Sequence, residues 1–230
     1  MNKIIPSLMI FLVLLISCKS EPEGSFDSSN LPGMIYDNDN RPCDKVVLTV
    51  WFMMEDMEGE MIHVQSDINV RITIPGLKSG NYKILAEKEG YENITTSIFY
   101  SSRLDVLYLK IFSQKQILNN AAESLEEKRF GTVDGLLIRA EKINENDPFF
   151  LYLKSVFMYE KKNYKAAVIP LEKIINQGYK FPYVHLLLAD IYQYELNEPQ
   201  KALIQLTIFV NLFDDSEVDF RIKELENNEI

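Results

Sequence analysis

The sequence predicts a multidomain chain, β then α, in which a small β-sandwich precedes an α-helical repeat array with a C-terminal capping helix. Apolar residues alternate with polar ones through residues 33–113, and recur at helical spacing through residues 114–230. The 230 residues also exceed the roughly 100–150 of a common single domain, so two folded units are expected. Apolar residues make up 47% of the chain and charged residues 25%, which argues against wholesale disorder.

Residues 1–17 have the pattern of a signal peptide. Lys3 precedes an almost unbroken apolar run from Ile4 to Ile16. This run is shorter than the roughly 20 residues that a helix needs to cross a bilayer, and it fits the apolar region of a secretory signal. We therefore expect this segment to be cleaved.

The end of this run, with Leu15, Ile16, Ser17 and Cys18 in succession, resembles the lipobox of bacterial lipoproteins. The resemblance implies that the Cys18 thiol carries diacylglycerol and that Cys18 becomes the first residue of the mature chain. Several acyl chains hold a protein on a membrane where a single chain does not. The alternatives are an ordinary signal peptide and a buried N-terminal helix.

Location follows from this resemblance. It implies a lipid-anchored protein of the bacterial cell envelope, with the membrane as its first partner. No aspartate follows Cys18, and an aspartate there retains some lipoproteins in the inner membrane, so the outer membrane is favoured. The periplasmic and surface faces both stay open. The polar, Ser-, Pro- and Glu-containing residues that follow make residues 18–32 a lipidated flexible tether in this interpretation.

Composition excludes several functions. The net charge of −10 and the absence of a basic stripe argue against a nucleic-acid partner. His63 and His185 are the only histidines and have no nearby second soft ligand, so no metal site or cofactor is expected. Asp37, Asp39 and the acidic run at 55–60 lack the ligand spacing of a calcium loop and are expected in solvated turns.

Strands are expected where β-branched and aromatic residues form short runs bounded by turn residues. In INVRITI, the four aliphatic residues from Ile68 to Ile74 alternate with polar residues and would share one face of a strand. Several short strands at this spacing favour a β-sandwich. The expected strands cover residues 46–52, 68–74, 82–88, 94–99 and 104–112.

The motifs GMIYDNDNRPCDKVVLTV, SDINVRITIPGL and SGNYKILAEKEGYE follow one another in this region. With them, about eighty residues resemble the carboxypeptidase-regulatory-like and PEGA-type β-sandwich family. The resemblance implies a spacer or adhesion module, and some members are thought to contact cell-wall glycans. One departure is Val70, which stands where the family has glycine; because valine does not tolerate positive φ, we expect this hairpin to be built differently. The matching residues are Gly33, Ile35, Asp37, Pro42, Asp67, Ile74, Pro75, Leu77, Gly80, Tyr82, Gly90 and Tyr91.

The second region contains an internal repeat. Val133, Ala167 and Ala202 begin aligned apolar segments and lie 34 and 35 residues apart. This period and the residue types, above all in KKNYKAAVIPLEKI, resemble tetratricopeptide repeats (TPR). The resemblance implies three helical hairpins.

In this interpretation, the first helices of the hairpins lie at about 115–127, 149–161 and 183–195. An amphipathic helix, SEVDFRIKELENN, follows the third hairpin, with Ser216 as its expected N-cap. Such a helix is expected to cap the repeat stack.

TPR architecture implies that the first helix of each hairpin lines a concave groove for a partner helix or peptide. The third repeat is ambiguous by one residue, because Ala189 suits the small packing position better than Asp190. The alternative is that the groove tyrosines pack between repeats or under the β domain. The carried-over positions are Leu118, Ala122 and Leu125, then Tyr152, Val156 and Tyr159, then Leu187, Ile191 and Tyr194.

No nucleophile elbow, phosphate loop or converging acid–base pair is present in the sequence, so no catalytic residue is predicted. The favoured function is a non-catalytic scaffold that binds an envelope protein or peptide in its TPR-like groove. The alternative is a cell-wall tether whose β-sandwich binds peptidoglycan.

Overall fold

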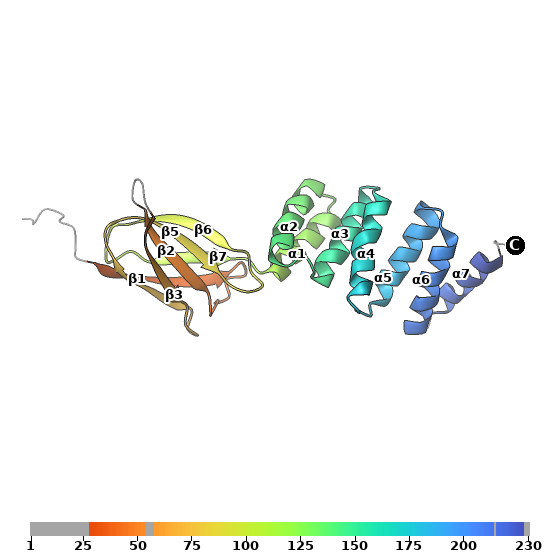
Figure 1. Ribbon diagram of the computed structural model, residues 1–230, viewed down its shortest axis with the longest axis horizontal. Coiled ribbons are helices and arrows are strands. Elements are labelled where there is room, and N and C mark those ends of the chain that lie inside the picture. The colour runs from red at the N-terminus through yellow and green to blue at the C-terminus, as the bar shows by residue number, and fades with distance from the viewer. Residues whose placement is uncertain (1–27, 54–57, 214, 228–230) are drawn as a thin grey trace, which may run out of the picture.

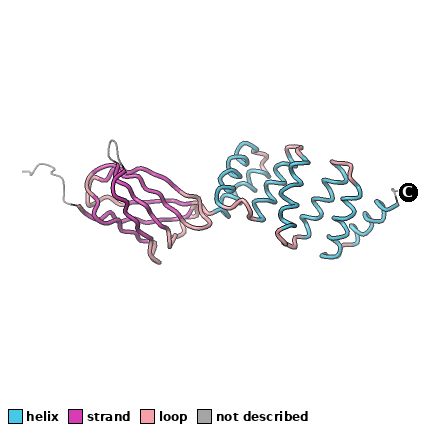
Figure 2. The backbone as a smooth tube through the Cα atoms, in the orientation of Figure 1, coloured by secondary structure: helices cyan, strands magenta, loops and turns pink. Residues whose placement is uncertain are grey.

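The computed structural model describes residues 28–53, 58–213 and 215–227 (Figure 1). A β domain and a helical domain lie end to end, and the helices stack along the long axis of the molecule (Figure 2). The expected signal peptide and Cys18 lie outside the described residues. Within the described ranges, no helix has the length and apolar character needed to span a membrane.

The β domain contains a three-stranded sheet, in the order β4-β1-β7, and a four-stranded sheet, in the order β3-β2-β5-β6. Side chains from both sheets form one hydrophobic core, in which Ile35, Leu48, Ile74 and Ile84 are completely buried. The strands are β1 Ser29–Asp37, β2 Val47–Met53, β3 Glu58–Gln65, β4 Arg71–Leu77, β5 Gly80–Glu87, β6 Ile94–Tyr100 and β7 Leu107–Ile111.

Two strands differ from the prediction. Residues 29–32, which we expected in the tether, belong to β1, and Leu31 is buried there with 2% exposure. β3 was not predicted, because the acidic run at 55–60 suggested a turn; the alternation that marks this strand begins at Ile62 and Val64, which are half-buried. The segment that we interpret as a tether is therefore four residues shorter at its C-terminal end than expected.

The prediction for the 68–74 strand was wrong at its start. Ile68 is 86% exposed, the strand begins at Arg71, and Val70 adopts the positive φ of +67° that we had excluded. Asp67 explains this conformation: its Oδ1 accepts hydrogen bonds from the backbone N–H groups of Asn69 and Arg71. These bonds hold a tight turn in which the fourth residue must be left-handed, whatever its side chain.

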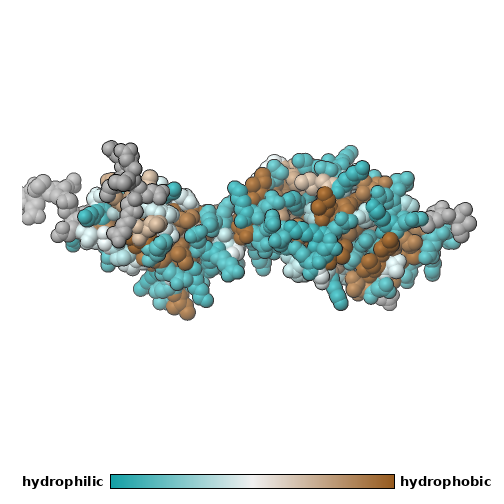
Figure 3. Space-filling view, viewed as in Figure 1, coloured by the Kyte–Doolittle hydropathy of each residue, from teal (hydrophilic) through white to brown (hydrophobic). Residues whose placement is uncertain are grey.

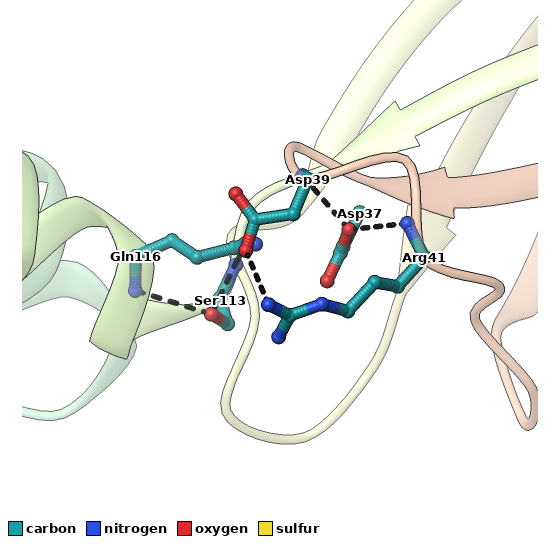
Figure 4. Close-up of polar contacts among 5 residues, drawn as sticks. All are labelled: Asp37, Asp39, Arg41, Ser113 and Gln116. Atoms are coloured by element: carbon teal, nitrogen blue, oxygen red, sulfur yellow. Dashed lines mark hydrogen bonds and ion pairs between the residues drawn. The ribbon is translucent and has the colours of Figure 1, made fainter.

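The same turn occurs at Asp37, and here the expectation of solvated turn acids is met only in part: Asp39 is exposed, but Asp37 is buried, with 7% exposure. Asp37 Oδ1 accepts from the backbone N–H groups of Asp39 and Arg41, both at 2.8 Å, and Asn40 takes the left-handed conformation with φ +60°. Figure 4 shows this turn beside the start of α1 (Gln114–Glu126). The turn thus marks the end of the β domain that faces the helices.

Strand direction separates the two ends of the β domain. β1 and β7 pair in parallel, from Gly33 opposite Leu107 to Asp37 opposite Ile111. Because β7 leads directly into α1, the start of β1 at Ser29 must lie at the opposite end of the domain. The chain therefore enters the β domain at one end and leaves it at the other (Figure 1).

The helical domain is an array of three antiparallel helical hairpins followed by α7, as the repeat predicted. One hydrophobic cluster runs through all of them, from Ile117 in α1 to Leu225 in α7. The expected N-cap of α7 shifts by one residue, because Asp215, not Ser216, accepts the hydrogen bonds of the first turn. The elements are α1 Gln114–Glu126, α2 Phe130–Ile143, α3 Pro148–Glu160, α4 Tyr164–Asn176, α5 Pro182–Asp190, the π-helix η1 Ile191–Glu195, α6 Pro199–Leu212 and α7 Ser216–Asn227.

The two domains meet at a short, bonded joint. Ser113 and Gln116 form a capping box that starts α1 (Figure 4). Backbone hydrogen bonds join Glu92 N–H to the carbonyl of Phe112 and Gln114 N–H to the carbonyl of Gly90. Arg139 of α2 donates two hydrogen bonds to the carboxylate of Glu92, at 2.9 and 2.6 Å. The direction of the helical array is thus set by contacts with the β5–β6 hairpin.

We predict that Asp37→Ala lowers the free energy of unfolding by about 1–3 kcal/mol, because two backbone N–H groups in a part-buried turn lose their acceptor. Asp67→Ala is the matched control: it removes the same two bonds from an exposed turn, where water can replace the carboxylate, so its loss should be smaller. Urea unfolding followed by circular dichroism measures both. Equal losses for the two variants would contradict the argument.

Candidate functional site

An open apolar pocket lies in the middle of the helical array, at the helix ends where α3 and α5 begin and α4 ends. Its volume is about 430 Å³, and no charged side chain lines it. Figure 3 shows apolar surface over the part of the array formed by α4, α5 and α6. The lining residues are Pro148, Phe149, Tyr152, Ile174, Phe181, Tyr183 and Val184.

Aromatic rings at the pocket rim are exposed although they are large and apolar. Phe149, Phe181 and Tyr183 are 42%, 45% and 61% exposed. Phe181 stacks on Tyr179 with 5.6 Å between ring centroids, and Tyr183 packs 6.3 Å from Phe213. Neighbouring rings restrict one another's rotamers, so the rim is partly ordered before any partner binds. Clustered exposed aromatic residues of this kind typically mark an interaction site.

The repeat positions these rings. α3 and α5 each begin with a proline, Pro148 and Pro182, whose fixed φ suits the first helical position. The next residues, Phe149 and Tyr183, are 34 residues apart and therefore occupy the same place in successive hairpins. Lys115 is the corresponding residue of α1. Our sequence prediction missed Phe149 and Tyr183, although an aromatic residue directly after a helix-starting proline, recurring at the repeat period, was the available signal.

A second, more polar hollow of about 450 Å³ adjoins the apolar pocket. Phe149 lines both hollows, so they adjoin at this residue. We call the two hollows together the groove: its polar part begins at the domain joint and its apolar part ends at α5. The residues lining the polar part are Gly90, Ser113, Gln114, Lys115, Leu118, Asn119, Asp147 and Phe149.

The predicted groove residues of the second repeat are only partly accessible from outside the protein. Tyr152 lies in the apolar pocket, and Val156 is half-buried beside it on α3. The Tyr159 hydroxyl donates to Glu195 Oε1 at 3.3 Å, and its ring packs edge-on to Tyr164 at 5.4 Å. Burial and the Glu195 carboxylate raise the pKa of Tyr159, so its hydroxyl remains a donor at neutral pH. Of these three, Tyr152 is the one that lines the pocket.

The third-repeat residues correct the prediction. Ile191 is completely buried in the core and is not available to a partner, and Leu187 is half-buried. Tyr194 is 66% exposed, but the guanidinium of Arg221 lies 4.9 Å above its ring. Arg221 also donates to Asp190 Oδ1 at 2.7 Å. The capping helix α7 thus interacts with the residues that were expected to extend the groove.

A one-residue insertion explains this error. Ala121, Ser155 and Ala189 are buried at 34-residue spacing, so α5 keeps the register of α1 and α3 up to this point. The turn at the end of the first helix is one residue longer in the third hairpin than in the second. In the second hairpin, Asn163 N–H donates to the carbonyl of Met158, five residues earlier. In the third, Glu198 N–H donates to the carbonyl of Tyr192, six residues earlier. The π-helix η1 absorbs the extra residue, which makes the last repeat interval 35 residues long.

With this register, Leu186 and Asp190 occupy the places that we assigned to Leu187 and Ile191. Asp190 is paired with Arg221, so the third repeat offers no apolar stripe beyond the pocket. The apolar surface that stays accessible is consequently centred on Phe149, Tyr152 and Tyr183 rather than spread along the three first helices.

The two histidines and Cys43 are engaged in contacts within the protein or buried. His63 Nδ1 lies 3.1 Å from Thr49 Oγ1, and His185 Nδ1 lies 2.8 Å from Gln205 Oε1. Cys43 is buried, and burial raises the pKa of its thiol. Across the described ranges, no three His, Cys, Asp or Glu side chains are grouped so as to hold a metal ion. A larger hollow of about 910 Å³ at the domain joint is lined by lysines and glutamates in equal number.

Comparisons with known proteins give structural likenesses only. No model of a protein family matches the sequence, and no curated protein matches it significantly. The N-terminal domain of stress-induced protein-1 from C. elegans is 17% identical, with a TM-score of 0.43, over 49% of this chain and 94% of that domain. YrrB, a TPR protein with an unusual peptide-binding site, is 21% identical, with a TM-score of 0.45, over 50% of this chain and 59% of YrrB.

A third likeness is to the Yersinia enterocolitica type III secretion chaperone SycD, solved in complex with a peptide of the translocator YopD. It is 11% identical, with a TM-score of 0.46, over 50% of this chain and 94% of that one. These likenesses concern the helical half of the chain.

The π-helix gives a testable prediction. Deleting Tyr194, which is exposed, should convert η1 into ordinary α-helix and give the third repeat the closing turn of the first two. We expect this variant to fold, with a midpoint of thermal unfolding within a few degrees of the parent, as followed by circular dichroism. Deleting Tyr159 is the control, because it shortens a helix that has no extra residue; this variant should be clearly less stable. Equal destabilisation would contradict the insertion.

Proposed function

We propose that this protein is a lipid-anchored, non-catalytic interaction scaffold of the bacterial cell envelope. Its helical array binds a peptide segment of an envelope protein in the groove. The observation that carries the proposal is the open apolar pocket whose rim rings, Phe149, Phe181 and Tyr183, remain exposed in a folded and otherwise well-packed array.

The chemistry of the groove defines the partner segment. A pocket of about 430 Å³ without charged lining accommodates one large apolar anchor side chain, such as leucine, phenylalanine or tryptophan, and shields part of it from water. The adjoining polar part offers Lys115, Asn119 and Asp147, which suit the backbone and polar side chains of the same segment. We therefore propose an amphipathic segment with its apolar anchor toward α5 and its polar residues toward the β domain.

The β domain serves as a spacer in this proposal. The tether joins it at Ser29 and the helical array at the opposite end, so β1 and β7 span the distance between anchor and groove. Nine residues of β1 correspond to a rise of about 26 Å at the usual spacing. A lipid on Cys18 would hold the protein at the membrane while the groove stays clear of it.

The second candidate function is a peptidoglycan tether. Trp51 supports it, because its half-buried ring lies on the outer face of the four-stranded sheet between Met61 and Lys83, where a flat aromatic surface can stack on sugar rings. The Lys83 ammonium lies 5.8 Å from the ring centroid. Co-sedimentation with purified peptidoglycan, compared for the parent chain and Trp51→Ala, distinguishes the tether from the scaffold.

Groove binding is tested by photocrosslinking in intact cells. A benzophenone side chain at Tyr183 should capture one envelope protein, and adding Phe149→Asp should reduce the yield roughly tenfold or more, because a charge in an apolar anchor pocket opposes binding. Phe220→Asp, on exposed α7 surface, is the matched charge control. A benzophenone at Tyr108, which is similarly exposed on β7, is the position control. The same product at similar yield from Tyr108 would contradict the proposal.

Anchoring is tested at the cysteines. Cys18→Ser should abolish metabolic labelling with radioactive palmitate and move the protein from the membrane fraction to the soluble fraction, because the thiol that accepts the lipid is lost. Cys43→Ser, which changes a buried thiol, should remain labelled and membrane-bound. A Cys18→Ser protein that stays in the membrane fraction and keeps its label would overturn the lipid anchor.

A further inference from the structure

The β domain has one edge strand without the usual protection against pairing with another chain. β3, β4, β6 and β7 each lie at the edge of a sheet. Exposed edges are normally blocked by charges, prolines or bulges. The pairing of β3 with β2 has a register shift, β4 carries Arg71 and Pro75, and β7 carries Lys110. β6, with the sequence ITTSIFY, has none of these features.

β6 is also regular and open. All seven of its residues pair with β5, from Ile94 opposite Ala86 to Tyr100 opposite Gly80, without a register shift. In the part of the chain that the structure describes, the backbone of residues 95–99 makes no hydrogen bond beyond this ladder. Because N–H and C=O groups alternate in direction along a strand, half of those on β6 face outward and offer a template for another strand.

The side chains of β6 leave apolar surface at this edge. Ile94, Thr96 and Ile98 point toward the core but remain half-buried. A hollow of about 260 Å³ lies at the end of the strand, between Ile98 and Leu107. On the outer face, Phe99 is 63% exposed. An added strand would therefore bury apolar groups on both faces, in addition to forming backbone hydrogen bonds.

We propose that β6 pairs antiparallel with β6 of a second copy of this chain, which joins two four-stranded sheets into one of eight strands. A twofold axis through Ser97 is the one register that pairs all seven residues. Residues opposite one another then lie on the same face, as antiparallel pairing requires. Ile94 lies opposite Tyr100 of the second copy and Thr95 opposite Phe99, pairs of β-branched and aromatic residues that stabilise sheets.

A second copy fits this edge because the strand is self-complementary. The paired segment contains no charge, so the twofold axis brings no like charges together. Ile94 of the second copy would cover the hollow beside Tyr100 and Leu107. The strands run in opposite directions, so the two helical arrays extend from opposite ends of the joined sheet.

Disulfide trapping tests the register directly, using the full chain in detergent. Residues on the axis have Cα atoms about 4.5–5.5 Å apart, within disulfide range, so Ser97→Cys should form a crosslinked dimer on mild oxidation. Thr95→Cys is the matched control on the same face: the two cysteines would be about 13 Å apart and should not crosslink. The parent chain, with Cys18 and Cys43, gives the background. Failure of Ser97→Cys to crosslink above this background, or equal crosslinking by Thr95→Cys, would overturn the pairing.

A charge at the axis provides an independent test. Ser97→Lys places two ammonium groups opposite each other and should raise the dissociation constant of the dimer roughly tenfold or more, as measured by analytical ultracentrifugation. Asn81→Lys, on the same face of neighbouring β5, should leave the dimer unchanged. Thermal unfolding controls for the fold of both variants. A monomeric parent, or a Ser97→Lys protein that dimerises like the parent, contradicts β6 pairing.

Discussion

The short joint between β7 and α1 is the constraint on which the rest of the structure depends. Only Phe112 and Ser113 separate the two elements, so the last strand fixes where the first helix begins. Glu92 N–H and Gln114 N–H then tie both sides of the joint to the β5–β6 hairpin. The Arg139–Glu92 pair is partly exposed and therefore contributes orientation more than stability. The polar part of the groove exists because this joint holds Gly90 beside α1 and α3.

Beyond the joint, the hairpins of the helical array repeat every 34 residues, with one exception in the third hairpin. Small residues at positions 121, 155 and 189 let the hairpins approach closely at a constant interval of 34 residues. Because of the extra residue in η1, the side chains that follow Asp190 no longer occupy the positions of their counterparts in the first two hairpins. Arg221 of α7 donates a hydrogen bond to Asp190, and its guanidinium lies over one face of the Tyr194 ring. The groove consequently ends at the aromatic pocket instead of continuing toward α7.

Hydrophobic period predicted most of the elements, but it missed β3 and the local exceptions. The first helices begin within one residue of the predicted positions, because apolar spacing and prolines define them well. Val70 was misjudged since its conformation is imposed by hydrogen bonds to Asp67, not by its own preference. The register error at Ile191 has a different origin: the sequence shows the 35-residue interval and the ambiguity at Ala189, but not that the extra residue lies after Asp190, in a π turn of five residues. Phe149 and Tyr183 were overlooked because the carried-over positions excluded the helix starts.

The surfaces proposed for binding occupy different parts of the molecule, and this separation has a physical consequence. β6 lies along the side of the β domain (Figure 1), whereas the groove is lined by residues of the domain joint and of α1, α3 and α5. The apolar part of the groove is lined only by residues of α3, α4, α5 and the segment before α5, so strand pairing between two copies leaves this pocket open in each. A partner that carries two anchor segments would bind the second groove at the effective concentration set by its own linker, which raises avidity without any new contact. Pairing through β6 and peptide binding in the groove thus reinforce each other rather than compete.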